Sequence, residues 1–277
     1  MIQEFLIAKD TEDALKLKRN NPRSVFYAGG TEINRLNSTV DAKTAISLSK
    51  LGLNSITDEG NSIRIGSMVT LQQLVDSDRV PQWLKEAALF CGSFTKRNMA
   101  TIGGNMAMCS DHSYLAPALL ASRARVLTAT ITEEGSYNED NMPIREYHAY
   151  HTLFSGTLLL GFLISKDSRF VGSLRYANTL QSQAAVTVGF GATKNGEGVI
   201  DHVRVFAAVK GIGLQRLPSV ENAIENGELT TKQDVQISVG HEVEAKDDTT
   251  GSSSYKRYIA SEGIAQLFSN FISGGVK

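Results

Sequence analysis

The sequence predicts an α+β fold in which a two-lobed region, residues 1–165, precedes a smaller α/β domain, residues 166–277. Three observations support this prediction. The length of 277 residues suits one large domain or two modest ones. Short apolar strand patterns alternate with amphipathic helix patterns in the first region. In the second region, strand patterns follow one another directly and precede the helices.

The first lobe, about residues 1–55, combines short strands with a helix. Thr11 stands before Ala14, Leu15 and Leu17, which is the pattern of a capped amphipathic helix. The apolar runs around it are bounded by polar and turn residues, as strands are. We therefore expect a helix at 11–19 and strands at 5–7, 25–28 and 44–48.

The second lobe, about residues 56–165, contains helix patterns between two short strands. Pro81 fits the first turn of a helix, where its missing N–H is not needed. We expect helices at 71–75, 82–90 and 114–122, and strands at 63–65 and 125–130. The apolar run at 158–160 is also typical of a strand.

The C-terminal domain, residues 166–277, is expected to be a sheet covered by helices. The pair Asn195-Gly196 lies between two apolar strands, and such a pair is a strong hairpin signal. We expect strands at 172–176, 184–191 and 202–209, and helices at 219–225 and 254–273.

Composition excludes several classes of function. The net charge of −1, from 28 basic and 29 acidic residues, predicts no binding of nucleic acid or of an anionic membrane surface. No apolar run reaches the roughly 18 residues of a membrane helix. The first residues lack the basic and apolar regions of a secretory signal, so we expect a cytoplasmic protein.

The cysteines and histidines predict no metal site. Cys91 and Cys109 are too few for a disulfide framework or a four-cysteine iron–sulfur cluster. If electrons pass through such clusters, another chain must hold them. His148 and His151 have half of a metal-ligand spacing, but no third ligand is evident.

Two glycine pairs are the most informative motifs. Gly29-Gly30 follows an apolar strand, and Gly103-Gly104 follows the short apolar run 100–102. Glycine permits positive φ and close approach to the main chain, and successive N–H groups in such bends bind anions. Two such bends can hold one diphosphate, which suggests a nucleotide cofactor. The alternative is that both are tight turns, since neither pair belongs to a G-x-G-x-x-G or Walker A motif.

The amino-acid sequences of these segments resemble those of a known family. Residues 26–33 (FYAGGTEI) and 96–105 (KRNMATIGGN) are similar to the two FAD signatures of the flavoprotein (medium) subunits of molybdenum hydroxylases, the xanthine dehydrogenase and carbon monoxide dehydrogenase group. Residues 63–71, 115–121 and 254–260 also resemble family segments, so the resemblance covers nearly the whole chain.

The resemblance implies a two-lobed FAD-binding domain of the PCMH/vanillyl-alcohol-oxidase type, followed by a domain like that of carbon monoxide dehydrogenase flavoprotein. It implies an FAD-dependent oxidoreductase subunit, similar to that of xanthine dehydrogenase, that is inactive on substrate alone. FAD would receive electrons from a [2Fe-2S] small subunit, beside a molybdopterin-binding large subunit, and pass them to NAD or another acceptor. The cofactor carries this chemistry, so no catalytic residue is expected.

The resemblance also assigns cofactor-binding residues by position. The diphosphate would bind the backbone of residues 28–31 and the Thr31 hydroxyl, and the second glycine segment would add amides and a hydroxyl. Glu32 is alternatively a solvated or helix-capping carboxylate, and Asn105 is alternatively a cap of the following turn. The expected set is Tyr27, Ala28, Gly29, Gly30, Thr31, Glu32, Ile33, Thr101, Gly103, Gly104, Asn105, Asp111, Tyr114, Leu159 and Arg175.

The sequence departs from the family pattern at the polar edge of the flavin. Tyr114 stands where relatives carry an acid, and Asp111 is displaced from that position. Either residue replaces the acid, or the contact is missing. Arg175 would place positive charge near the flavin N1/O2 edge, or else it is a surface arginine. Leu159 lies beneath the ring or is an ordinary strand residue.

Three functions remain open at this point. The first is the FAD subunit of a molybdenum hydroxylase complex. The second is a stand-alone flavin-dependent oxidoreductase, which would need a substrate pocket and an acid or base near the flavin. The third is a flavin-free assembly module, which the intact glycine pairs argue against and Tyr114 mildly favours.

Overall fold

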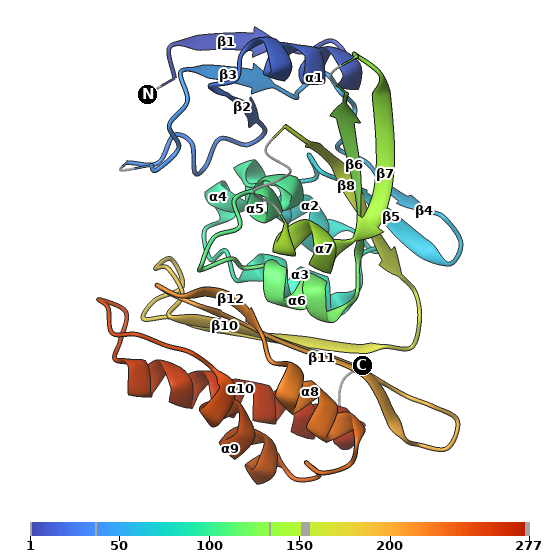
Figure 1. Cartoon of the computed structure of the whole chain (residues 1–277), viewed down its shortest axis with the longest axis vertical. Helices are drawn as coiled ribbons and strands as arrows, with labels where there is room; N and C mark the ends of the chain where they lie inside the picture. The colour runs from blue at the N-terminus through green and yellow to red at the C-terminus, as the bar shows by residue number, and fades with distance from the viewer. Residues whose placement is uncertain (1, 37, 133, 151–155, 275–277) are drawn as a thin grey trace. The chain divides into compact units, whose positions relative to one another are not determined.

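The fold is described from a computed structural model that covers residues 2–36, 38–132, 134–150 and 156–274. The chain forms two compact units (Figure 1). Unit 1 comprises Met1–Val80, Phe94–Met108 and Ala124–Lys166, and unit 2 comprises Pro81–Ser93, Cys109–Arg123 and Asp167–Lys277. The α+β fold class predicted from the sequence is confirmed by the mixture of sheets and helices.

Unit 1 begins with a parallel three-stranded sheet of order β1-β3-β2. Its strands are β1 (Glu4–Ile7), β2 (Ser24–Tyr27) and β3 (Thr44–Ser47), and helix α1 (Thr11–Asn20) lies on one face (Figure 1). Leu15 of α1 packs there with Leu6 and Ile46 in an apolar cluster. The N-cap of α1 is Asp10 and lies one residue before Thr11, because the Asp10 side chain accepts a hydrogen bond from the Asp13 N–H.

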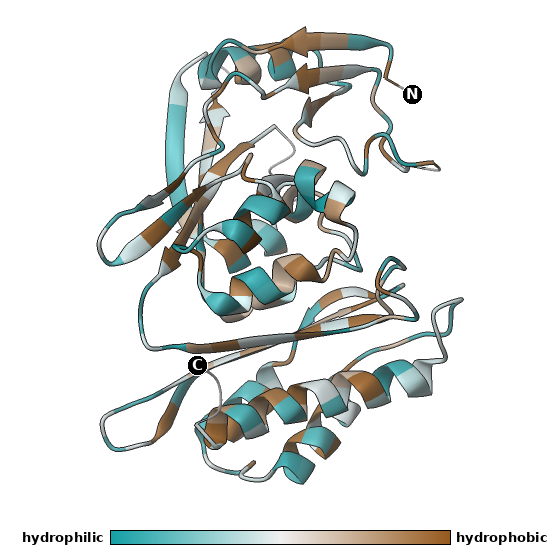
Figure 2. Cartoon of the chain, turned by 180° about the vertical axis from the view of Figure 1, so that it is seen from behind, coloured by the Kyte–Doolittle hydropathy of each residue, from teal (hydrophilic) through white to brown (hydrophobic). Residues whose placement is uncertain are grey.

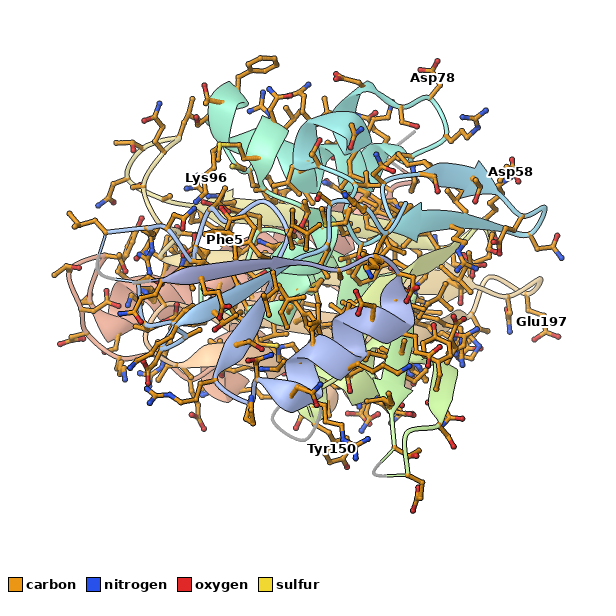
Figure 3. The ribbon with its side chains drawn as sticks, turned by 90° about the horizontal axis from the view of Figure 1, so that it is seen from above. Phe5, Asp58, Asp78, Lys96, Tyr150 and Glu197 are labelled. Carbon is orange, nitrogen blue, oxygen red and sulfur yellow. The ribbon has the colours of Figure 1, made fainter. Side chains whose placement is uncertain are left out.

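The opposite face of this small sheet carries exposed apolar side chains. Phe5, labelled in Figure 3, is 56% exposed, and its ring meets that of Tyr27 edge to face with centroids 5.2 Å apart. Strand β3 lies between β1 and β2, so the two rings meet across the central strand of the sheet. The chain leaves β2 on this side and enters the first glycine pair.

The larger sheet of unit 1 is antiparallel, with strand order β4-β5-β8-β6-β7. Its strands are β4 (Ile56–Asp58), β5 (Ser62–Gly66), β6 (Arg125–Ile131), β7 (Tyr137–Pro143) and β8 (Leu158–Ser165). Besides α1, the described part of this unit contains helices α2 (Leu71–Asp76), α4 (Phe94–Met99), α5 (Ile102–Ala107) and α7 (Ile144–Ala149). Helix α2 starts at a capping box, in which Thr70 and Gln73 bond each other's main-chain N–H.

Unit 2 is built on an antiparallel sheet of order β12-β11-β10-β9. Its strands are β9 (Phe170–Tyr176), β10 (Val186–Lys194), β11 (Ile200–Val209) and β12 (Gly213–Arg216). Helices α8 (Pro218–Glu225), α9 (Lys232–Glu242) and α10 (Ser253–Ile272) cover one face, and α3 (Gln82–Leu89) and α6 (Ala116–Ala121) cover the other (Figure 1).

The two faces of this sheet use different residues of β10. Val188 and Phe190 point into the apolar cluster shared with α10. Gly189 and Gly191 alternate with them and receive α6, since an added Cβ would lie 2.3 Å from the Pro117 or Ala121 carbonyl oxygen. Hydrophobic and hydrophilic residues alternate along α10, as Figure 2 shows, because only one side of this helix packs on the sheet.

The predicted hairpin between β10 and β11 is confirmed, but its turn is longer than the Asn-Gly pair suggests. The Asn195 N–H donates to the Val199 carbonyl, and the Asn195 side chain accepts from the N–H groups of Glu197 and Val199. The positive φ falls at Gly198, at 81°. Asn195 therefore organises the loop from its first position.

Several elements carry no clear periodic signal and were not predicted. Strand β7 reads YNEDNMP and is held at the sheet edge by main-chain pairing with β6. Helix α9 buries Val235 and Val239 and leaves Ile237 55% exposed, so its apolar pattern is weak. In the described part of the chain, no helix has both the length and the apolar character needed to cross a membrane.

A buried lysine anchors the start of α10. Lys256 is fully buried, and its ammonium donates to the carbonyl oxygens of Lys210 and Lys246 and pairs with Asp248 at 2.6 Å. Burial of the Asp248 carboxyl by itself raises its pKa, but hydrogen bonds from Lys256 and Thr250 outweigh this effect and lower the pKa to about 2. The pair therefore depends on an ionised Asp248.

We expect Asp248→Asn to destabilise the protein by ~3 kcal/mol at neutral pH, because it leaves the Lys256 charge buried without its partner. The ion pair stabilises fully above the ordinary aspartate pKa of 3.8 and is lost as the pH falls towards about 2. Chemical denaturation from pH 7 down to acid should therefore show the difference between wild type and variant shrinking below pH 4 or so. Asp41→Asn, which breaks an exposed pair with Arg23, is the control and should cost under ~1 kcal/mol. Equal effects of the two variants would contradict this account.

Candidate functional site

The first glycine pair packs directly against the approach to the second. A Cβ added to Gly29 would lie 1.7 Å from the carbonyl oxygen of Met99. No side chain fits at that distance, so the main chain of the first bend touches the residue two positions before Thr101. The two segments that the sequence singled out are therefore neighbours within unit 1.

The first bend presents unused main-chain donors. Among the described residues, no acceptor receives a hydrogen bond from the N–H groups of residues 29–33, although Gly30 is buried. A main-chain hydrogen bond closes the turn, in which the Asn34 N–H donates to the Gly30 carbonyl at 2.9 Å. Gly30 is the one buried residue of the five, and the other four are half-buried. Because a buried N–H is nearly always paired in folded proteins, the unpaired N–H of Gly30 and those beside it fit an anionic group such as a diphosphate.

Side chains brace this turn. Gly30 has a φ of 67°, which favours glycine. A Cβ there would also lie 2.2 Å from the Tyr27 hydroxyl and 2.9 Å from Asn34 Nδ2. These two groups are hydrogen-bonded to each other at 2.7 Å. The main-chain donors are thus held in place by the Tyr27–Asn34 contact and by the Met99 carbonyl.

The second glycine pair is built differently. Thr101 is the N-cap of α5, with its side chain accepting from the Gly104 N–H at 3.0 Å. The Gly103 N–H donates to the Ser67 carbonyl, and the Asn105 N–H donates to the Thr101 carbonyl, both at 2.9 Å. In this structure all three amides donate within the protein, and the expectation that amides of this segment bind the diphosphate stays a prediction.

Gly103 is required by packing within the protein. Its added Cβ would meet the Ser67 carbonyl oxygen at 2.7 Å. Segments 67–71 and 100–103 run side by side, as the Thr70–Thr101 bridge shows. Asn105 lies inside α5 and is not the cap, which is Thr101. What this segment offers a ligand is the half-buried Gly104–Asn105 side of α5.

Glu32 carries two ion pairs. One carboxylate oxygen lies 2.9 Å from Arg35 Nε, and the other lies 3.4 Å from Lys96 Nζ. Residues 31–34 form a turn rather than a helix, so Glu32 is not a helix-capping residue. Sequence reasoning did not assign Lys96 a role, although two basic residues, Lys96 and Arg97, directly precede the second glycine segment.

The remaining predicted residues of unit 1 lie on regular elements or beside the bend. Leu159 is a buried residue of β8, opposite Thr128 of β6. Ala28, Thr31 and Ile33 are half-buried in the segment after β2. The site residues of unit 1 thus gather around one bend, with Leu159 in the adjoining sheet.

Asp111 belongs to unit 2 and is fully engaged there. Its carboxylate accepts from Lys210 Nζ at 3.0 Å and from the Gly211 N–H at 2.8 Å, and it contacts His112 Nδ1 at 2.7 Å. Burial by itself raises the pKa of Asp111, but the hydrogen bonds from His112, Gly211 and Lys210 together lower it. Its contacts are those of a structural anion that ties residue 111 to the β11–β12 turn.

Arg175 and Tyr114 are neighbours in unit 2. The Arg175 guanidinium carbon lies 5.8 Å from the centre of the Tyr114 ring, and Tyr114 is only 9% exposed. The guanidinium donates to the carbonyl oxygens of Thr179 and Ser182, while its Nε is buried without a partner among the described residues. Burial lowers the pKa of Arg175. Arg175 is therefore not a simple surface arginine.

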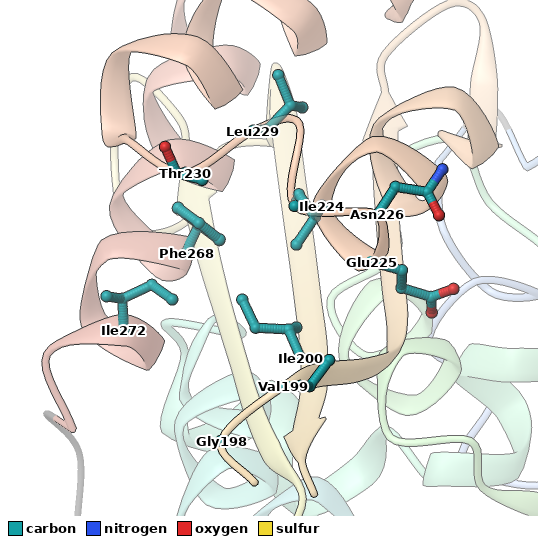
Figure 4. Close-up of a pocket in the computed structure, with 11 residues that line it drawn as sticks. Gly198, Val199, Ile200, Ile224, Glu225, Asn226, Leu229, Thr230, Phe268 and Ile272 are labelled. Carbon is teal, nitrogen blue, oxygen red and sulfur yellow. The ribbon is translucent and has the colours of Figure 1, made fainter.

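A pocket of about 310 Å³ opens elsewhere in unit 2, beside the β10–β11 hairpin (Figure 4). Ile200, Ile224 and Phe268 give it apolar walls, with Glu225 at its edge. None of the predicted site residues lines it. Among the described residues, no group of three His, Cys, Asp or Glu side chains is arranged to hold a metal ion, and His151 lies outside those residues.

Comparisons with known proteins give one family match and a relative of similar length. Residues 1–164 match the family described as the FAD binding domain in molybdopterin dehydrogenase. The uncharacterized protein YgfM of Escherichia coli K12 is 31% identical over 278 residues, which cover 99% of this chain and 98% of YgfM.

Two solved structures share the fold. That of carbon monoxide dehydrogenase from Hydrogenophaga pseudoflava has a TM-score of 0.86 at 20% identity and covers 100% of this chain and 99% of its own. That of quinoline 2-oxidoreductase from Pseudomonas putida 86 has a TM-score of 0.82 at 16% identity, with 99% and 98% covered.

The contact between Gly29 and Met99 leads to a prediction about stability. Gly29→Ala should destabilise the protein by ~2 kcal/mol or more, because its methyl group must displace a main-chain carbonyl. Gly196→Ala is the matched control, since nothing lies within 4 Å of an added Cβ there. Thermal denaturation of both variants tests this. A Gly29→Ala protein as stable as Gly196→Ala would show that the two glycine segments are not in contact.

Proposed function

The chain belongs to the family of FAD-binding domains of molybdopterin dehydrogenases, and on this premise we propose that it passes electrons from iron–sulfur clusters of a partner subunit to NAD or another acceptor. It is an FAD-binding oxidoreductase subunit of the molybdenum hydroxylase type. Substrate oxidation would take place on a molybdopterin-binding large subunit, as in xanthine dehydrogenase, so the chain alone would not act on substrate. The cytoplasm is the proposed location.

The observation that carries the cofactor site is the run of unpaired N–H groups at residues 29–33. Two phosphate groups carry negative charge that several aligned main-chain dipoles neutralise without a mobile side chain. When bound, FAD supplies the redox chemistry. The protein's own contribution is to hold the diphosphate at this bend, and Thr31 offers a hydroxyl beside it.

The second glycine segment would contribute through side chains. Its amides are used within the protein, so Asn105 rather than the main chain is the proposed contact there. An amide side chain both donates and accepts, which suits a ribityl hydroxyl. Thr101 would act by fixing the start of α5.

In unit 2, the contacts favour Tyr114 over Asp111 as the replacement for the usual flavin-edge acid. The Asp111 carboxylate already has three partners, His112, Lys210 and Gly211. We propose Tyr114 and Arg175 as residues that face the flavin, on the strength of the family resemblance and of their mutual contact. The FAD-binding domain is proposed to span 1–165, which the family match to residues 1–164 supports.

Purification from the native host tests the proposed function. We expect the chain to carry FAD, seen in the visible absorption spectrum, and to co-purify with subunits that contain iron, sulfide and molybdenum.

Gly30→Val should lower flavin occupancy, because a branched Cβ disfavours a φ of 67° and collides with Tyr27. Gly196→Ala should keep full occupancy.

The outcomes separate the three candidate functions. A colourless protein that still joins the complex would indicate a flavin-free assembly module. A flavin-containing protein that purifies without partners would indicate a stand-alone oxidoreductase. Undiminished flavin in Gly30→Val would contradict the assignment of the diphosphate to the first bend.

The position of Arg175 leads to a prediction about the midpoint potential of the flavin. If its guanidinium faces the flavin N1/O2 edge, Arg175→Ala should lower the flavin midpoint potential, because positive charge stabilises the anionic reduced ring. Arg175→Lys should retain most of the wild-type potential. Spectroelectrochemical titration of the three proteins measures this. An unchanged potential in Arg175→Ala would restrict Arg175 to its contacts with residues 179 and 182.

A further inference from the structure

Lys96 reaches the first bend from a separate element of unit 1. It lies on α4, and its ammonium pairs with Glu32, two residues beyond Gly30. Helix α4 buries none of its side chains, so apolar packing does not explain its position. Arg97 Nε donates to Gln72 Oε1 at 2.9 Å and ties the helix to α2. The Arg97–Gln72 hydrogen bond and the ion pair with Glu32 thus both contribute to the position of Lys96, which is labelled in Figure 3.

The charges around the bend do not cancel. Arg35 comes from the same turn as Glu32 and makes the shorter contact, at 2.9 Å. Glu32 is therefore already neutralised locally, and Lys96, at 3.4 Å, adds a second positive charge. Among the described residues, the cluster of Glu32, Arg35 and Lys96 has a formal charge of +1 beside the unpaired amides.

We propose that Lys96 binds the cofactor diphosphate directly, a role that rests on the proposed function of the bend. A lysine ammonium has three donors, so it keeps its contact with Glu32 while donating to a phosphate oxygen. Glu32 tempers this attraction because its carboxylate competes for the same ammonium and repels the phosphate. Lys96 is 34% exposed and Glu32 is 22% exposed, so salt screens the interaction only in part.

A purely structural role for Lys96 is the rival explanation. In that case Lys96 would act only by bracing Glu32 and, through it, the turn. The two explanations differ when Glu32 is neutralised, because a brace needs the carboxylate and a contact with phosphate does not. A double-mutant cycle on Lys96 and Glu32 separates them.

The experiment titrates the full-length chain, stripped of flavin, with FAD and follows flavin fluorescence. Lys96→Gln should weaken FAD binding about tenfold, the usual worth of a charge-assisted hydrogen bond. Glu32→Gln should tighten FAD binding. Lys96→Gln should weaken binding in the Glu32→Gln background by at least the same factor. Added KCl should weaken binding to wild type more than to Lys96→Gln.

The control is Lys16→Gln, which removes a lysine paired with Glu12 on α1 and should leave FAD affinity unchanged. Thermal denaturation of each flavin-stripped variant checks that the fold is retained. If Lys96→Gln has no effect in the Glu32→Gln background, Lys96 is only a brace and the proposal is overturned, while the proposed function stands. If wild type itself does not bind FAD, both are overturned.

Discussion

The close approach of Gly29 to the Met99 carbonyl is the contact on which the candidate site depends. It fixes the first bend to the chain that enters α5. That chain is paired with residues 67–71, and the Ser67 N–H donates to the Leu160 carbonyl of β8. Main-chain contacts therefore connect the bend to the large sheet of unit 1, and the Tyr27–Asn34 hydrogen bond and the Lys96–Glu32 ion pair add side-chain contacts. These contacts form the bend before any ligand arrives, and a preformed site favours tight binding.

The two glycine pairs differ in whether their main-chain N–H groups are used within the protein. In the second pair, the Gly103 N–H donates to the Ser67 carbonyl and the Gly104 N–H donates to the Thr101 side chain, so both amides are used within the protein. The first pair leaves its amides without partners among the described residues. An unsatisfied buried donor costs about 1–3 kcal/mol. A bound diphosphate would remove that cost, and thereby would stabilise the folded unit as well as locate the cofactor.

Sequence reasoning succeeded where local pattern decides structure. The strands and helices with apolar periodicity, such as β11 and α10, lie within a few residues of their predicted positions. Strand β7 was missed because its residues are polar and only pairing with β6 defines it. The glycine pairs could be recognised in the sequence, but the contacts that require glycine at these positions could not. Met99 and Lys96 meet the first bend through tertiary contacts that no local pattern encodes.

Helix α6 shows that the end of the family match does not coincide with the boundary of a packed unit. All six of its residues are buried, and its carbonyls lie against Gly189 and Gly191 of β10. The family match ends at residue 164, yet this helix completes its core only with strands that come later in the chain. A recombinant fragment cut at the match boundary would expose that apolar helix to solvent and be prone to aggregation. Fusions and truncations of this protein should therefore keep both units intact.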